Sequence, residues 1–238
     1  MIADAADIHD DLSRKRFHER ADEVVNHDAP TASRTARPCA RKKPFCFALL
    51  IAIFALPLHA TAADTWVLLP EPTFMGHQVT RPIPGAKSTV LAVARFTDVG
   101  PEYARTEQWK TLGITDESVT AATHQQASEW LKQTSPEFIR NKRKVVEYAV
   151  IQSDKVPVAA TVLTPEFWHR FEGTFGPKMR VVIPNRNTVY IFPDVAEDLQ
   201  PHAGLIIDAW RSEAPKVSLE VFQLTEKGLQ AIGKFEEP

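Results

Sequence analysis

The chain has 238 residues, a formal net charge of −2, 44% hydrophobic and 24% charged residues, and 9 glycines beside 18 prolines. This is the composition of an ordinary globular protein, so a fully disordered chain, a collagen-like repeat and a coiled coil are excluded. The near-neutral charge also argues against a dedicated nucleic-acid-binding protein, which needs a basic face to neutralise phosphates.

A signal peptide is predicted before the folded part. Three consecutive basic residues end at Lys43, the next uncharged stretch at 45–58 is almost wholly apolar, and small residues follow up to Ala63. The apolar stretch is too short to span a bilayer, which needs roughly 20 residues. A basic start, an apolar run and small residues in this order are typical of a secretory signal, cleaved here after Ala62 or Ala63. An uncleaved anchor and a buried helix are the alternatives.

The predicted signal peptide, residues 41–63, does not stand at the start of the chain. Residues 1–40 precede it as a polar extension that holds eight acidic residues, the last of them Asp28. Because a signal peptide normally begins at the N-terminus, we hypothesise that translation starts between about Val24 and Arg41. Under this hypothesis the extension is not translated; the alternative is a genuine polar extension.

The mature chain is expected to be one domain, residues 64–238. Both cysteines, Cys39 and Cys46, precede it, so it would hold no disulfide, thiolate nucleophile or cysteine-based zinc site. It carries 19 Lys and Arg against 22 Asp and Glu, a net charge of −3. We expect a mildly acidic protein that is exported, periplasmic and soluble after signal cleavage.

Three elements are predicted in the first half of this domain. A short apolar segment at 66–69 and a β-branched run at 88–96 indicate strands. Thr115 is followed by two acidic residues and then by apolar residues at helical spacing up to Leu131. This pattern predicts a helix, because acids in the first turn interact favourably with the helix dipole.

Two further helix starts are predicted from one shared pattern. Ser135 and Thr164 are each followed by proline and then glutamate. A hydroxyl at the N-cap with proline at the first helical position favours a helix in both places. A later helix is predicted from Asp194, which forms a capping-box pattern with Glu197, and Pro201 is expected to bend or split it.

The remaining apolar runs predict strands, at 144–152, 156–163, 179–183, 188–192 and 217–224. Short connections join the first two and the next two, so two hairpins are expected. We therefore predict an α+β fold, a mostly antiparallel sheet with helices packed on one face.

The histidines of the mature chain are candidate site residues, but none has the spacing of a metal-binding motif: His77, His124, His169 and His202. His169 lies three residues from both Glu166 and Glu172, where a helix brings a carboxylate next to the imidazole. His169 and Glu172 are therefore the candidate catalytic residues; a solvated ion-paired face is the alternative. No metal site and no cofactor are predicted.

A polar turn separates the strands at 179–183 and 188–192. Asn185 and Asn187 are explained by the turn itself, because asparagine tolerates left-handed backbone angles. Arg186 is not required by the turn, and at an exposed hairpin tip it can hold a carboxylate or phosphate with two hydrogen bonds. We take Asn185, Arg186 and Asn187 as candidate binding residues.

Four segments resemble an uncharacterised bacterial family of the YtpQ-like kind, a domain of unknown function. They are the strand with its following acid at 88–98, the helix start at 109–115, the alanine-rich run at 159–163 leading to Trp168, and the segment Val181 to Arg186. These residues extend over roughly two thirds of the mature chain. The family pattern has an acidic residue after its Asn-Arg pair, where this chain has Asn187. The resemblance implies no particular activity.

These patterns predict an exported, non-catalytic binding or interaction domain of the cell envelope, whose partner is an envelope protein or a small ligand and not a nucleic acid. The alternative is an envelope hydrolase or another enzyme with dispersed catalytic residues, since active-site residues are commonly far apart in sequence.

Overall fold

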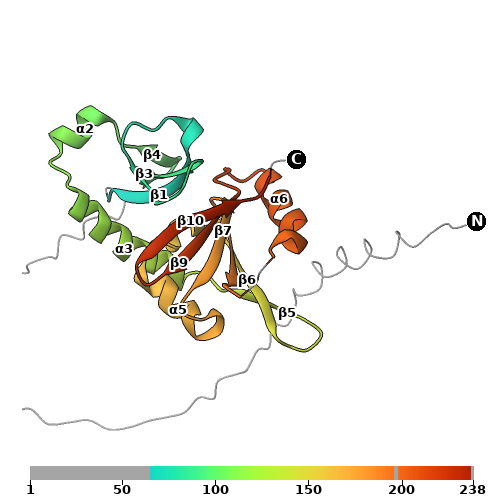
Figure 1. The fold of residues 1–238 in the computed structure, drawn as a ribbon. Coiled ribbons are helices and arrows are strands. Elements are labelled where there is room, and N and C mark those ends of the chain that lie inside the picture. Colours follow the sequence, from blue (N-terminus) through green and yellow to red (C-terminus); the bar gives the residue numbers. More distant parts are fainter. Residues whose placement is uncertain (1–64, 196–197, 237–238) are drawn as a thin grey trace, which may run out of the picture. The chain divides into compact units, whose positions relative to one another are not determined.

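The computed structural model describes residues 65–195 and 198–236 (Figure 1). Within this part, the chain is an α+β protein with two antiparallel sheets and five α-helices. The polar extension, the signal peptide and its expected cleavage site at Ala62 and Ala63 lie outside the described residues. No helix in the described residues is long and apolar enough to cross a membrane.

The first sheet has four strands built around β3, at Thr89–Thr97. One edge of β3 pairs with β1, Val67–Pro72, and the other pairs with β2, Thr80–Pro82, and with β4, Gly100–Tyr103. The strands predicted at 66–69 and 88–96 are thereby confirmed. β2 and β4 escaped prediction because strands of three and four residues are too short for a periodic signal.

The second sheet has six strands in the order β10-β9-β7-β8-β6-β5. In chain order they are β5 Glu137–Arg140, β6 Val146–Gln152, β7 Met179–Asn185, β8 Thr188–Pro193, β9 Glu220–Thr225 and β10 Gly228–Lys234. The hairpin predicted from the apolar runs at 179–183 and 188–192 is confirmed as the pair β7 and β8. β10 was missed, because its sequence contains two glycines and only a weak apolar alternation.

The helices are α2 Thr106–Thr111, α3 Asp116–Lys132, α4 Val158–Thr161, α5 Pro165–Phe175 and α6 Ala203–Arg211, with single 3-10 turns at Thr73–Met75 and Gln200–His202. The sequence predicted that all helices pack on one face of the sheet, and this is wrong for the six-stranded sheet. Val181 belongs to a core with residues of α3, α4 and α5, whereas the next residue, Val182, belongs to a core with Ile206 of α6. Neighbouring strand residues point to opposite faces, so α6 covers the face opposite α5.

The strand predicted at 156–163 is wrong, because this segment forms the one-turn helix α4. Every residue of α4 is buried, and it packs against α3 and β1. A short, almost wholly apolar run shows no periodicity that separates a buried strand from a buried helix. The hairpin predicted between this run and β6 is therefore absent, and β6 pairs instead with β5 and β8.

The helix predicted after Ser135 is also wrong, since Glu137 opens β5. The same pattern after Thr164 does begin a helix, α5. After Thr164, Phe167, Phe171 and Phe175 recur at helical spacing and are buried, whereas the residues after Phe138 lead into a polar turn. The pattern at the helix start was too weak to decide the structure without a continuing apolar stripe.

The last predicted helix begins later than expected. Its regular part, α6, starts after Pro201, which stands in a 3-10 turn at Gln200–His202. Asp194 makes an ion pair with Arg180 at 3.6 Å instead of capping α6. Glu197, its predicted capping partner, lies outside the described residues.

Candidate functional site

A cleft of about 510 Å³ lies between the four-stranded sheet and the β9–β10 end of the six-stranded sheet. Its walls also include α3, the start of α5 and the segment that joins α4 to α5. A cleft of this size, assembled from elements far apart in sequence, is typical of small-molecule sites.

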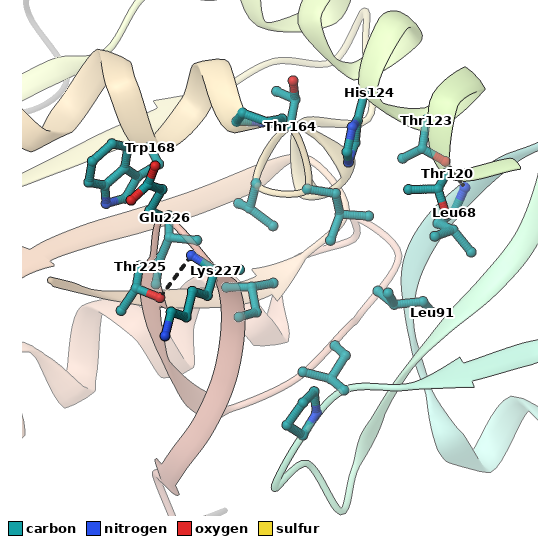
Figure 2. A pocket seen from close by; sticks show the side chains of 18 of the residues that line it. Leu68, Leu91, Thr120, Thr123, His124, Thr164, Trp168, Thr225, Glu226 and Lys227 are labelled. Atoms are coloured by element: carbon teal, nitrogen blue, oxygen red, sulfur yellow. Dashed lines mark hydrogen bonds between the residues drawn. The ribbon is translucent and has the colours of Figure 1, made fainter. Parts of the chain in front are cut away.

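Most of the residues lining the cleft are apolar. Trp168 of α5 contributes an aromatic ring, and five leucines come from the first sheet, the α4–α5 segment and the β9–β10 end: Leu68, Leu91, Leu163, Leu224 and Leu229. Figure 2 shows Trp168 with Thr225, Glu226 and Lys227 towards one side, and Leu68, Leu91, Thr120 and Thr123 towards the other. His124 of α3 extends into the space between these two groups. The cleft thus joins an apolar surface to a few polar groups.

Hydrogen bonds hold α3 against the first sheet at one wall of the cleft. The Leu68 amide donates to Thr123 Oγ1 at 2.8 Å. Arg81 of β2 donates to Thr120 Oγ1 at 2.6 Å and to the Asp116 carboxylate at 2.8 Å. This wall is therefore fixed by contacts between β1, β2 and α3, and the two Nη atoms of Arg81 are already occupied by its own chain.

Thr164 lies where the chain enters α5, and it borders the cleft. Its hydroxyl donates a hydrogen bond to the Glu166 carboxylate. This bond lowers the pKa of Glu166 below its usual range, aided by a backbone hydrogen bond and, more weakly, by the charges of His124 and His169. Glu166 is thus held as a carboxylate at the N-terminus of the helix, where the helix dipole also favours an anion.

The candidate pair His169 and Glu172 does come together. His169 Nδ1 lies 3.2 Å from Glu172 Oε1, and His169 lines the cleft. The side chains are 61% and 39% exposed, however. Such a pair on a solvated helix face stabilises little and leaves both groups in contact with water.

The turn at Asn185, Arg186 and Asn187 is a structural junction and not the exposed hairpin tip expected from the sequence. Asn185 Nδ2 donates to the Ala209 carbonyl at 2.7 Å, and Asn187 Nδ2 donates to Asp154 at 3.2 Å. The backbone of Arg186 also bonds to neighbouring segments at both its amide and its carbonyl. The turn lies close to the body of the protein because segments on either side cover it.

Arg186 forms a buried ion pair with Glu71 of β1. Its Nε and Nη2 atoms donate to the same oxygen, Glu71 Oε1, at 3.1 and 2.7 Å, and Nη2 also donates to the Tyr103 hydroxyl at 2.8 Å. The side chains of Glu71 and Arg186 are only 3% and 14% exposed. An external anion would have to displace Glu71 in order to bind Arg186.

His77 completes this buried cluster. Its ring stacks on Tyr103 with 3.8 Å between centroids, and its Nε2 lies 3.9 Å from Glu71 Oε2. Burial lowers the pKa of His77, the Glu71 carboxylate opposes this shift, and Arg186 adds to it. Burial and the neighbouring carboxylate raise the pKa of Tyr103. Neutral His77 and Tyr103 therefore surround one buried ion pair, which links the two sheets.

A second buried carboxylate, Glu220 of β9, also links the sheets. One of its oxygens accepts hydrogen bonds from the amides of Lys87 and Ser88 at 2.6 and 3.0 Å. The other accepts from Thr89 Oγ1 at 2.7 Å. Glu220 thereby joins the start of β3 to the strand that carries the β9–β10 wall of the cleft.

Sequence reasoning missed Glu71, Tyr103, Glu220 and the polar residues of the cleft around Lys227. None carries a local signal, because each is an ordinary residue until folding brings its partner close. In the described residues, no group of three or more His, Cys, Asp or Glu side chains is placed to hold a metal ion. His202 contacts the rings of Tyr148 and Phe192 on the α6 side, so it lies among aromatic residues and outside the cleft lining.

No family model matches the chain, and neither a curated protein nor a solved structure matches it significantly. The resemblance to the YtpQ-like family therefore stays a hypothesis.

Proposed function

We propose that this chain is a non-catalytic binding domain of the cell envelope and that the cleft between its two sheets holds the ligand. The observation that carries this proposal is a cavity of about 510 Å³ whose lining combines an apolar surface with polar and charged side chains. Sites for small molecules and for single protruding groups of partner proteins are commonly built in this way.

The lining favours a ligand with an apolar or aromatic body and a small polar part. Leu91, Leu163 and Leu229 contribute an apolar surface that gains free energy when it is removed from water. His124 and Lys227 supply polar groups that can orient such a ligand. We infer a small amphipathic molecule or an apolar side chain of an envelope protein.

The hydroxyl groups of the cleft support a binding role over a catalytic one. Those in the described lining belong to four threonines: Thr120, Thr123, Thr164 and Thr225. Their hydrogen-bond partners are backbone groups, Arg81 and Glu166, and none of them forms a hydrogen bond with a histidine in the described part of the chain. Hydroxyl nucleophiles normally need a neighbouring base with a group that orients it.

An envelope hydrolase or another enzyme with dispersed residues is the alternative function. The observation in its favour is the position of His169, which borders the cleft and lies 3.2 Å from Glu172. The exposure of both side chains makes an ordinary surface ion pair the simpler account.

Filling the cleft should weaken ligand binding. We expect Leu229→Trp to weaken binding of the apolar fluorescent probe N-phenyl-1-naphthylamine by about tenfold or more, because the larger ring occupies the space between β10 and α5. The measurement is a fluorescence titration of the full chain, with circular dichroism to verify folding.

Ile232→Trp is the matched control, since Ile232 lies on the same strand, is 47% exposed and does not line the cleft. Equal probe affinity in the two variants, or no probe binding by the unsubstituted chain, would contradict the assignment of the cleft as the binding site.

We further propose that the chain is exported and cleaved after Ala62 or Ala63, on the basis of the sequence pattern at 41–63. N-terminal sequencing and intact mass of the protein from fractionated native cells should give a start at Ala63 or Asp64 in the soluble envelope fraction. A retained apolar segment would contradict cleavage, and peptides that map upstream of Val24 would contradict the downstream start of translation.

A further inference from the structure

The loop that joins β5 to β6 is an ordered turn held by Asn141. Its side-chain Oδ1 accepts hydrogen bonds from the backbone amides of Arg143 and Val145 at 2.9 and 3.0 Å. Its backbone amide donates to the Val145 carbonyl at 2.9 Å. Arg140 Nη1 donates to the Lys144 carbonyl at 3.0 Å. In Figure 1 this loop, beside the β5 label, reaches out beyond the end of the sheet.

Four of the five residues at this turn are cations with exposed side chains: Arg140, Lys142, Arg143 and Lys144. None of the four forms an ion pair with an acid in the described part of the chain. The acids nearest in sequence, Glu137 and Glu147, each stand three residues outside the run. The turn therefore concentrates positive charge on a protein whose mature part is mildly acidic.

An apolar side chain accompanies these cations. Val145 follows Lys144 directly and is 58% exposed, although a β-branched residue is normally at least half-buried in a sheet protein. A branched apolar side chain beside several cations is suited to the boundary between lipid headgroups and acyl chains.

We propose that this basic turn, residues 140–145, docks the protein on a bilayer surface rich in anionic phospholipids. A protruding turn presents its cations outwards over a surface and does not surround a single small anion, so a planar array of negative charges is the partner that it fits. Each cation held near such a surface raises the partition coefficient by about fivefold. The turn would keep the cleft close to the membrane, but it does not depend on what the cleft binds.

The test is co-sedimentation of the full chain with phospholipid vesicles. We expect the chain to bind vesicles that contain phosphatidylglycerol more strongly than vesicles of phosphatidylcholine alone, with a difference that shrinks as salt screens the charges. Lys142→Glu with Arg143→Glu should weaken the phosphatidylglycerol-dependent binding by more than about 25-fold, because two attractive charges, each worth about fivefold, become repulsive. The N-terminal segment, which carries its own basic residues up to Lys43, contributes equally in every variant, so the comparison between variants isolates the contribution of the turn.

The matched control is Lys110→Glu with Lys155→Glu, which changes the net charge equally at two exposed positions away from the turn. If the glutamate pair at the turn impairs folding, Lys142→Gln with Arg143→Gln removes the charges more gently and should still lose about 25-fold. Equal losses in the turn variant and the control, or no preference for phosphatidylglycerol, would overturn the proposal. So would binding to soluble heparin without binding to vesicles. The probe-binding assay for the cleft uses variants at Leu229 and Ile232 and none at the turn. A negative result for the cleft therefore leaves the membrane-docking proposal standing, and the reverse also holds.

Discussion

Arg186→Ala is expected to lower the free energy of unfolding by about 3–5 kcal/mol, because it leaves the Glu71 carboxylate buried without its charge partner. The loss includes the two hydrogen bonds to Glu71 Oε1 and the one to Tyr103. Urea unfolding followed by circular dichroism measures this change. Because the pair joins β1 to the β7–β8 turn, we also expect the cleft to bind its probe less tightly.

The double substitution Glu71→Met with Arg186→Met separates the cost of an unpaired charge from the value of the pair itself. A buried ion pair replaced by apolar residues of similar size is often neutral in stability, so the double variant should be more stable than Arg186→Ala. Arg211→Ala, at an exposed position, should change stability by no more than about 0.5 kcal/mol. A loss below about 1 kcal/mol in Arg186→Ala would contradict the buried pairing.

Glu220→Ala should cost about 3 kcal/mol of stability. The carboxylate accepts from two backbone amides and one hydroxyl at 87–89, and all three donors would lose their partner, the Thr89 hydroxyl in a buried place and the two amides in a partly buried one. Urea unfolding again gives the free energy. Hydrogen exchange at the amides of Lys87 and Ser88 should accelerate, because these amides lose the acceptor that protects them.

Glu220→Gln is the graded control for this position. The amide keeps one oxygen for the two backbone donors and can donate to Thr89 Oγ1, so about 1 kcal/mol should be lost. Glu213→Ala removes an exposed carboxylate and should be nearly neutral. Equal effects of Glu220→Ala and Glu213→Ala would show that the carboxylate does not link the sheets.

α3 and α5 were predicted correctly because the residues that begin each helix and bury one of its faces lie close together in the sequence. Thr115 accepts a hydrogen bond from the Ser118 amide, acids occupy the first turn, and buried side chains recur at helical spacing up to Leu131. Each of these features depends on residues within one or two turns, so α3 begins where its sequence indicates. α5 shares the acid in its first turn and the buried side chains at helical spacing, from Phe167 to Phe175, although Thr164 makes no side-chain hydrogen bond to the backbone at its start.

The partner of Arg186 was not anticipated. Arginine at an exposed turn was expected to hold a carboxylate or phosphate of a ligand, whereas the structure pairs it with the carboxylate of Glu71, 115 positions away in its own chain. Residue type limits the class of partner, since a guanidinium pairs with acids. Only the tertiary structure brings Glu71 close enough to occupy Arg186.

Local sequence therefore sufficed for the α+β class, the central hairpin and the long helices, because capping and periodicity act over neighbouring residues. The tertiary structure alone decided that α4 is a helix, that two sheets form, and that α6 covers the second face of the larger sheet. It also built the cleft, whose walls come from segments between Leu68 and Leu229. The physical reason is one and the same: burial and hydrogen bonding at these places depend on partners that are distant in sequence.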